Sequence, residues 1–455
     1  MQKGKTMGMD FTQGPIMPML LKFFLPFLLA NALNNLYNTV DAVIIGQFLG
    51  SYGIVAVSMG GKMLALYTLV GTALAAAGQV LISQHIGAGR KDELNSTIGT
   101  LFSELLAFSV LFAIINLCFG SSIMALINTP DDSLIPALDY LRITSIGLPL
   151  MFGYNAVSSV LRAMGDSKSP LLFIAIATVL NIVLDIVFIV FFNLGVVGTA
   201  LATVIGQGVS LVFSLTLLYR KRAEFGFDFK LSSFKVVWSK LALLLKLGLP
   251  LSMRGVFIIA TQMYLLSFIN SFGMAASAAY NVSDKIYHVA NIFAISVREA
   301  GGTMVAQNIG ARRYDRVKTI VGSVAKVSFS AAAIMAAISL AFPKTVFSAF
   351  SSDPQVLAQA ASYMMVCCVI YFLSAAIAPY EGVVSGTGNA KLGFLGGMLD
   401  GVFFRIGFGM LFGLVLDMGA LGFFLGDALA RTGIVLVGAI YYHSGKWMKY
   451  RIISD

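Results

Sequence analysis

The sequence has 455 residues, of which 58% are hydrophobic and only 11% are charged. Soluble globular domains carry about 25% charged residues, so this composition excludes a soluble globular protein. The net charge of +10 would suit nucleic-acid binding if it formed one basic surface. In a membrane protein the same excess marks the cytoplasmic loops, so we predict a polytopic membrane protein with no nucleic-acid partner.

Apolar stretches between polar or turn-rich breaks predict twelve transmembrane helices. A span needs about 20 apolar residues, and breaks such as GAGRKDE at 87–93 separate one stretch from the next. The predicted spans are 18–46, 53–82, 94–126, 135–160, 170–192, 196–219, 243–271, 275–307, 317–343, 355–386, 392–415 and 418–443. We therefore expect an all-α fold with both termini on one side of the membrane.

Charges segregate between the two sets of loops. The loops on the side of the termini hold most of the lysines and arginines, among them Lys3, Lys5, Arg90, Lys91, Arg220, Lys221, Arg222, Arg312, Arg313, Lys391, Lys446 and Arg451. The opposite loops hold Lys344 together with Asp131, Asp132, Asp353 and Asp417. Short cytoplasmic loops carry the lysine and arginine excess. We therefore predict a multi-pass protein of the inner or plasma membrane with both termini in the cytoplasm.

An internal repeat relates the two halves of the chain. GQVLISQHIGAGRKDE at 78–93 resembles GGTMVAQNIGARRYDR at 301–316, which places Gln307 opposite Gln84. The same spacing of 223 residues relates Gly165 to Gly388. Matched polar and glycine residues in loops indicate duplication of six helices, with the two copies related by a pseudo-two-fold axis along the membrane normal. We predict an N-terminal lobe over 1–219, a cytoplasmic basic linker over 220–246 and a C-terminal lobe over 247–455.

Acidic residues at membrane depth are costly and mark ion or substrate pathways. Asp41 follows Tyr37 in span 18–46, Asp185 lies one turn after Asn181 in span 170–192, and Thr203 lies in span 196–219. Because residues four apart share a helix face, we predict that Asp41, Asn181, Asp185 and Thr203 converge within the first lobe. Two adjacent carboxylates in a low-dielectric interior do not both stay ionised, so one takes a proton or the pair binds a cation. The alternative is that each aspartate is tied to Ser, Thr or backbone groups and only fixes helix packing.

Several of these segments carry a family resemblance. YNTVDAVIIGQFLG at 37–50, the pair SQHIGAGR and AQNIGARR, and LRAMGDSKSP followed by NIVLDIVF at 181–188 resemble the multidrug and toxic compound extrusion (MATE) family, prokaryotic type. The resemblance implies a cation site in the first lobe at Asp41, Asn181, Asp185 and Thr203. It also implies that Tyr140 and Asn155 support this site, together with Tyr37, and that the substrates are drugs or toxic organic compounds.

The second half has its own charges at membrane depth. Asp284, with His288 one turn later, and Glu381 would attract cationic drugs if they faced a central cleft, so we predict that both acids line a substrate path. Asp427 and Arg431 are four residues apart, which favours a structural intrahelical pair.

Motifs for catalysis and ATP hydrolysis do not occur in the sequence. No G-x-x-x-x-G-K-[ST], G-x-S-x-G or H-E-x-x-H is present, and the three cysteines and three histidines lack metal-ligand spacing. We therefore predict a monomeric non-enzyme without cofactor or metal, driven by an H⁺ or Na⁺ gradient. It would export amphipathic, often cationic, compounds by alternating access.

Two alternatives remain at this level. A flippase for a lipid-linked precursor would need cationic residues for pyrophosphate, and Arg254, Lys285, Arg298 and Arg405 lie at membrane depth. A membrane enzyme or scaffold without transport would leave the repeat and the intramembrane Asp41 unexplained.

Overall fold

The computed structural model describes residues 8–450 and 452. The chain ends and three residues of the predicted cytoplasmic charge excess, Lys3, Lys5 and Arg451, lie outside the described residues. Within residues 8–450 all regular secondary structure is helical, which confirms the predicted all-α fold.

The first half of the chain forms five helical segments of membrane length or more. They are α1 (Ile16–Gly87), α2 (Lys91–Leu126), α3 (Asp131–Ala163), α4 (Lys168–Ile186) with its π-helical continuation η1 (Val187–Phe191), and α5 (Gly195–Arg220). The 72 residues of α1 would extend about 108 Å as one rod, which is far longer than a bilayer is thick. Its backbone leaves helical geometry at Gly50, with φ 64° and ψ −162°, so α1 contains two spans.

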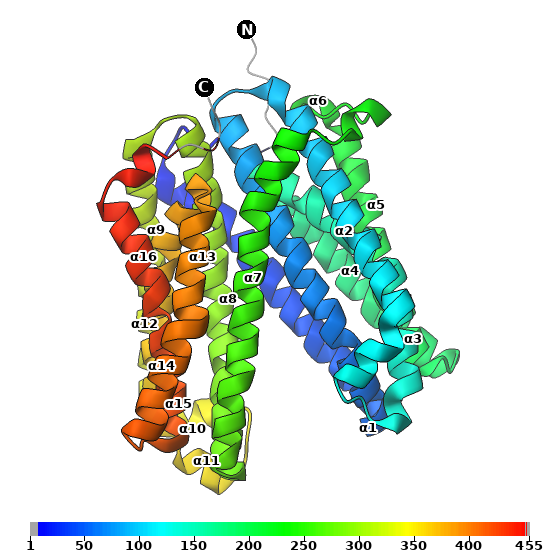
Figure 1. Cartoon of the computed structure of the whole chain (residues 1–455), viewed down its shortest axis with the longest axis vertical. Helices are drawn as coiled ribbons and strands as arrows, with labels where there is room; N and C mark the ends of the chain where they lie inside the picture. Colours follow the sequence, from blue (N-terminus) through cyan, green and yellow to red (C-terminus); the bar gives the residue numbers. More distant parts are fainter. Residues whose placement is uncertain (1–7, 451, 453–455) are drawn as a thin grey trace. The chain divides into compact units, whose positions relative to one another are not determined.

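The second half repeats this order (Figure 1). Four of its long segments are single helices: α7 (Trp238–Ser271), α8 (Met274–Gly310), α9 (Tyr314–Ala341) and α12 (Ala360–Thr387). A fifth is a continuous rod formed by α13 (Ala390–Met398), η3 (Leu399–Phe404), α14 (Arg405–Met410) and η4 (Leu411–Val415). The sixth is a rod formed by α15 (Gly419–Ala430) and α16 (Thr432–His443). Short α10 (Pro343–Ser348) and α11 (Pro354–Ala358) connect α9 to α12. Ten of the described helical segments are long and apolar enough to cross a membrane. Because α1 contains two spans, it adds one more to this number. The helix α8 adds another: it is long enough, but it carries the charged residues Asp284, Lys285, Arg298 and Glu299. The described residues therefore contain twelve spans.

The backbone confirms the internal repeat. The left-handed φ of 81° at Gly165 recurs as 70° at Gly388, and the φ of 56° at Gly195 recurs as 60° at Gly419. The π-helical stretch Val187–Phe191 recurs as Leu411–Val415. These matches keep the spacing of 223 to 224 residues, so the duplicated unit is a six-helix lobe.

The chain packs into two compact units. The first unit contains Leu29–Leu249 together with the described part of Met1–Asp10, and the second contains Phe11–Leu28 and Pro250–Asp455. The start of α1 therefore belongs with the second unit, and the start of α7 belongs with the first. In the second unit the amide of Phe11 donates a hydrogen bond of 3.1 Å to Gln307 Oε1. The predicted domain boundaries at 219 and 247 stay a prediction. Residues 11–28, which precede the first boundary, pack with the second unit.

The segment between α5 and α7 is packed onto α2. It contains the short helices α6 (Arg222–Phe225) and η2 (Leu231–Phe234), and Phe225 and Phe227 are 0% and 1% exposed. Asn95 Nδ2 of α2 donates a hydrogen bond of 3.2 Å to Ser233 Oγ, and the amide of Val237 donates one of 3.2 Å to Thr100 Oγ1. This segment, predicted as a linker, contributes to the core of the first unit.

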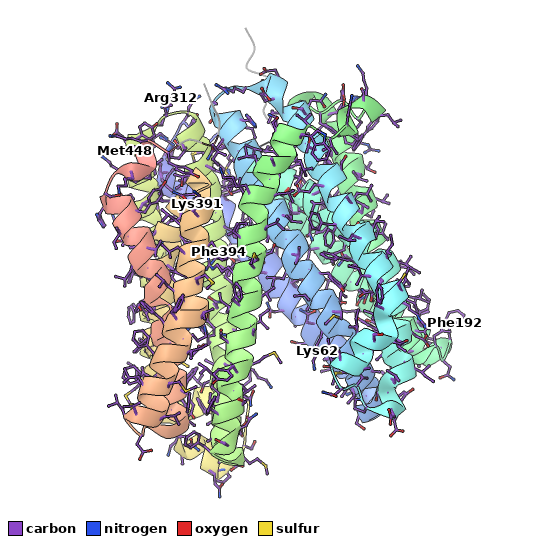
Figure 2. All side chains as sticks on the ribbon, in the orientation of Figure 1. Lys62, Phe192, Arg312, Lys391, Phe394 and Met448 are labelled. Atoms are coloured by element: carbon purple, nitrogen blue, oxygen red, sulfur yellow. The ribbon has the colours of Figure 1, made fainter. Side chains whose placement is uncertain are left out.

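Side chains within the second unit keep the predicted segregation of charge. Arg312 and Lys391 lie at one end of this unit (Figure 2). Lys344 lies in α10 and Asp353 comes directly before α11, and both of these helices lie at the other end (Figure 1). In the first unit Phe192 projects outward beside η1 and is 64% exposed (Figure 2). Exposed phenylalanine and leucine side chains along such helices suit contact with lipid.

Candidate functional site

The first unit brings Asp41 and Asp185 together. Asp41 lies on α1 and Asp185 lies on α4, where Asp185 is 0% exposed and Asn181, one turn earlier, is 3% exposed. The two carboxyl groups are close enough for one to donate a hydrogen bond to the other once it carries a proton. The pair thus has the geometry of a site that binds one positive charge.

Most polar atoms of these side chains have no hydrogen-bond partner among the described residues. Within the described residues, Asp41 Oδ1, both carboxylate oxygens of Asp185 and both amide atoms of Asn181 are buried without a hydrogen-bond partner. Buried polar atoms in proteins are nearly always hydrogen-bonded. The reading in which serines, threonines or backbone groups tie down each aspartate therefore has no support at Asp185. The unsatisfied oxygens suit a proton or a cation.

A glycine on α5 lets this helix approach Asn181 of α4. A Cβ atom at Gly206 would lie 3.5 Å from Asn181 Cβ and 3.4 Å from the carbonyl oxygen of Ala177. One turn earlier on α5, Thr203 Oγ1 lies 3.4 Å from the hydroxyl of Tyr37 on α1. Tyr140 of α3 is 5% exposed and lies beside Thr203 and Asp41. Four helices therefore contribute to one polar cluster.

Asn155 does not join this cluster. It lies on α3 fifteen residues after Tyr140, which is about 22 Å along a helix axis. Asn155 is half-buried, and within the described residues it makes no hydrogen bond to Asp41 or Asp185. The structure thus gathers Asp41, Asn181, Asp185, Thr203, Tyr37 and Tyr140, and leaves Asn155 outside.

Glu104 is a buried acid that the sequence reasoning missed. It lies on α2 and is 3% exposed, and both carboxylate oxygens lack a hydrogen-bond partner among the described residues. The signal was available, because Glu104 is an isolated acid in the apolar run LFSELLAFSV at 101–110 and such acids mark functional positions by default.

Glu381 of the second unit is paired with two arginines. Glu381 on α12 accepts hydrogen bonds from Arg254 of α7 and, at 3.0 Å, from Arg298 of α8. Two guanidinium groups compensate its charge, which weakens the attraction of Glu381 for a cationic drug. Its predicted role as a substrate-lining residue, like that of Asp284, stays a prediction.

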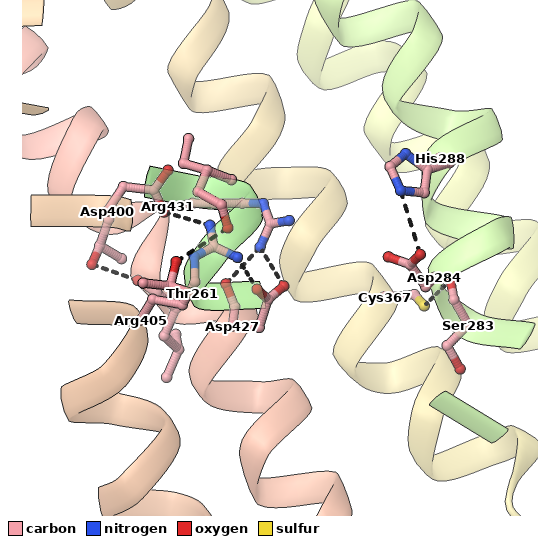
Figure 3. Close-up of polar contacts among 12 residues, drawn as sticks. Thr261, Ser283, Asp284, His288, Cys367, Asp400, Arg405, Asp427 and Arg431 are labelled. Atoms are coloured by element: carbon pink, nitrogen blue, oxygen red, sulfur yellow. Dashed lines mark hydrogen bonds and ion pairs between the residues drawn. The ribbon is translucent and has the colours of Figure 1, made fainter. Parts of the chain in front are cut away.

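A second group of charges joins α14, η3 and the rod of α15 and α16. Arg405 binds Asp400, at 2.9 Å, and Asp427. Arg431 binds the Asp427 carboxylate at 3.2 Å, which confirms the predicted intrahelical pair. Figure 3 shows this group, with Asp284 lying apart from it and bound to His288 of α8 at 3.4 Å.

Known proteins resemble this chain over most of its length. A family model described as MatE matches residues 26–187 and 250–398. The probable multidrug resistance protein YpnP of Bacillus subtilis (strain 168) is 28% identical over 98% of this chain and 99% of its own length. The multidrug export protein MepA of Staphylococcus haemolyticus (strain JCSC1435) is 24% identical over 84% of each chain.

A solved structure shares the fold. An outward-facing multidrug resistance MATE family transporter of the MOP superfamily superposes with a TM-score of 0.90 at 20% sequence identity, covering 99% of this chain and 100% of that chain. At this identity the likeness shows the fold alone.

Proposed function

This chain belongs to the MatE family, and from that premise we propose that it is an antiporter that exports amphipathic, often cationic, organic compounds in exchange for H⁺ or Na⁺. Relatives named as multidrug resistance and multidrug export proteins support the substrate class and the direction. The buried pair of Asp41 and Asp185, whose oxygens lack hydrogen-bond partners among the described residues, is the observation that supports ion coupling.

The pair offers a binding mode for either ion. A proton on one carboxyl group would form the hydrogen bond to the other and halve the charge of the pair. A sodium ion would take oxygen ligands from both carboxylates, Asn181 Oδ1 and Thr203 Oγ1. Thr203 also contacts Tyr37 of α1 at 3.4 Å, so that a sodium ion bound to Thr203 would change the contacts of α1 with α5.

Coupling follows from linkage between the two binding events. If the ion favours the conformation that releases drug, the ion lowers drug affinity by the same factor as the drug lowers ion affinity. Alternating access would then need no ATP. We further propose a plasma-membrane monomer with both termini in the cytoplasm, because the loops on the side of the termini hold most of the lysines and arginines of the sequence.

Efflux of ethidium or norfloxacin from a pump-deficient bacterial host tests this proposal. We expect efflux from cells that express the chain, its loss when the gradients are collapsed, and its loss in Asp41→Asn and Asp185→Asn at normal membrane expression. Asp139→Asn is the matched control, because Asp139 lies on α3 with an exposed side chain paired to Arg142.

Separately imposed pH and Na⁺ gradients identify the ion. Wild-type efflux in both Asp41→Asn and Asp185→Asn would refute the coupling site. A well-expressed protein that exports none of a broad panel of dyes and drugs would refute multidrug export and favour the flippase.

A further inference from the structure

The second unit contains a cavity of about 220 Å³ whose wall is rich in arginine. Arg254 of α7, Arg298 of α8, Arg405 of α14 and Arg431, between α15 and α16, all line it. Asp400 is the acidic residue that lines the same wall. No step of the proposed ion coupling uses this cavity, because Asp41 and Asp185 belong to the first unit.

The charges around the cavity do not balance. Arg254 and Arg298 share the single carboxylate of Glu381. Arg405 and Arg431 form ion pairs with Asp400 and Asp427. The two groups together contain four guanidinium groups and three carboxylates. His288 also lines the cavity, and it is paired at 3.4 Å with Asp284, which lies apart from the arginine group (Figure 3). An uncompensated charge at membrane depth is costly, so the cavity favours an anion.

Unused hydrogen-bond donors point to the same ligand. The side chain of Arg405 is 2% exposed, and its Nε is buried without an acceptor among the described residues, although both Nη atoms are bound to aspartates. A guanidinium group has five N–H donors, and Arg298 places one of them on Glu381. A buried donor without an acceptor indicates that the acceptors around Arg405 are too few, and an anion bound in the cavity would accept hydrogen bonds from the remaining N–H groups of Arg298.

The remaining wall identifies the chemistry of the anion. Ile258, Ile295, Ile377 and Ile434 line the cavity beside the arginines, so that an apolar body fits against the charged part. A planar guanidinium group binds a carboxylate through two parallel hydrogen bonds. The excess of one positive charge matches a monoanion, whereas phosphate or pyrophosphate would bring more negative charge and no apolar surface.

We propose that this cavity binds the carboxylate of an amphipathic organic anion or zwitterion. The site would add carboxylate-bearing compounds to the ligands of the protein, beyond the cationic compounds of the proposed export function. Binding at this site does not depend on ion coupling.

Isothermal titration of the purified full-length protein in detergent with 2-naphthoate tests the proposal. We expect saturable binding, with the neutral isostere 2-naphthamide weaker by about tenfold or more. Arg298→Gln and Arg254→Gln should each raise the Kd for 2-naphthoate by about tenfold, and each leaves Glu381 with one arginine. Arg298→Lys keeps the charge without the planar fork and should lie between wild type and Arg298→Gln.

Two further variants complete the design. Arg142→Gln is the control, because Arg142 lies on α3 in the first unit with a side chain 53% exposed, and it should bind 2-naphthoate as wild type does. Ile377→Trp narrows the cavity without touching an ion pair, so it should abolish binding even if the arginine variants fold poorly.

Equal affinity for 2-naphthoate and 2-naphthamide, or unchanged affinity in Ile377→Trp, would overturn the proposal. A lower Kd for inorganic phosphate or pyrophosphate than for 2-naphthoate, measured by competition for the same site, would also overturn it. That result would favour a phosphate-binding site. Asp41→Asn should retain 2-naphthoate binding while it loses efflux, so a failure of the export proposal is distinguishable from a failure of this one.

Discussion

Arg405 Nη2 donates a hydrogen bond of 2.9 Å to Oδ1 of Asp400, five residues earlier in the chain. In an α-helix residues five apart do not share a face, but Leu399–Phe404 is π-helical and its hydrogen bonds join residues five apart. The π-helical stretch therefore turns both side chains to the same side of the rod, where Asp427 also binds Arg405.

Asp400→Asn should destabilise the protein, although the aspartate and asparagine side chains have nearly the same size. The substitution leaves Arg405 and Arg431 to share the carboxylate of Asp427, and loss of one partner from a buried ion group costs about 3 kcal/mol. Equilibrium unfolding in mixed micelles with increasing SDS measures the change. Asp139→Asn, in the exposed pair with Arg142, should cost less than about 0.5 kcal/mol. Equal effects of the two substitutions would contradict this interpretation of the arginine group.

Asn181→Ala should reduce gradient-driven efflux by about tenfold or more, since it removes an oxygen beside Asp185 that has no other hydrogen-bond partner among the described residues. Asn155→Ala should change efflux by less than about twofold, because Asn155 lies about 22 Å along α3 from Tyr140. Ethidium efflux at matched expression compares the two. If Asn155→Ala proved as damaging as Asn181→Ala, the cluster described above would not be the whole coupling site.

Arg316→Gln should release the start of the second unit. Its guanidinium group donates hydrogen bonds to the carbonyl oxygens of Phe11, Gln13 and Gly14 at 2.9, 3.0 and 3.0 Å. Hydrogen bonds from a charged donor contribute about 1.5 kcal/mol or more each. We therefore expect faster chymotryptic cleavage after Phe11, which is 0% exposed in the native structure. Arg313→Gln, at an exposed neighbouring position, is the control, and equal cleavage in the two variants would refute the role of Arg316.

The segment between α5 and α7 should loosen in acid. A hydrogen bond from the Ser233 hydroxyl, and then one from the Lys230 amide, lowers the pKa of exposed Asp228 below its ordinary value of 3.8. A carboxyl group whose pKa is lowered by folding stabilises the fold above its ordinary pKa, and this contribution disappears as the pH falls through the lowered value. The Lys230 amide, which donates a bond of 3.1 Å to Asp228, should therefore lose protection below about pH 3.8.

Hydrogen-exchange mass spectrometry between pH 6 and pH 3 checks this expectation once intrinsic exchange rates are corrected for pH. The amide of Val237 is the internal reference, because its acceptor is the neutral hydroxyl of Thr100. Asp228→Asn should show the loosened behaviour at every pH. Parallel loss of protection at Lys230 and Val237 would assign the change to global unfolding instead.

The helices of this fold were predictable because their signals are local. Runs of apolar residues set the spans, and the glycines that end them, such as Gly165 and Gly388, adopt the left-handed conformations that glycine tolerates best. The spacing of Asn181 and Asp185 placed both on one helix face for the same reason. Even the break within α1 at Gly50 follows from the length that a bilayer allows.

The pairing of charges was less predictable, because it depends on contacts between helices. Nothing in the local sequence indicates that Arg254 and Arg298 both turn toward Glu381. The contact of Asp400 with Arg405 required a π-helical stretch, which helical periodicity of 3.6 residues does not reveal. Asn155 was carried over from a family resemblance, which gives no distance between two positions on one helix.

The placement of residues 11–28 in the second unit has a consequence for biosynthesis. This segment is made early, but the amide of Phe11 finds its acceptor on Gln307, 296 residues later. At a synthesis rate of about 5–20 residues per second, the first turns of α1 wait roughly 15–60 seconds in the membrane before their partners emerge from the ribosome. During that interval Phe11, Phe23 and Phe27, all buried in the finished protein, face lipid or the insertion machinery. The second unit completes its core only after both halves of the chain have been translated.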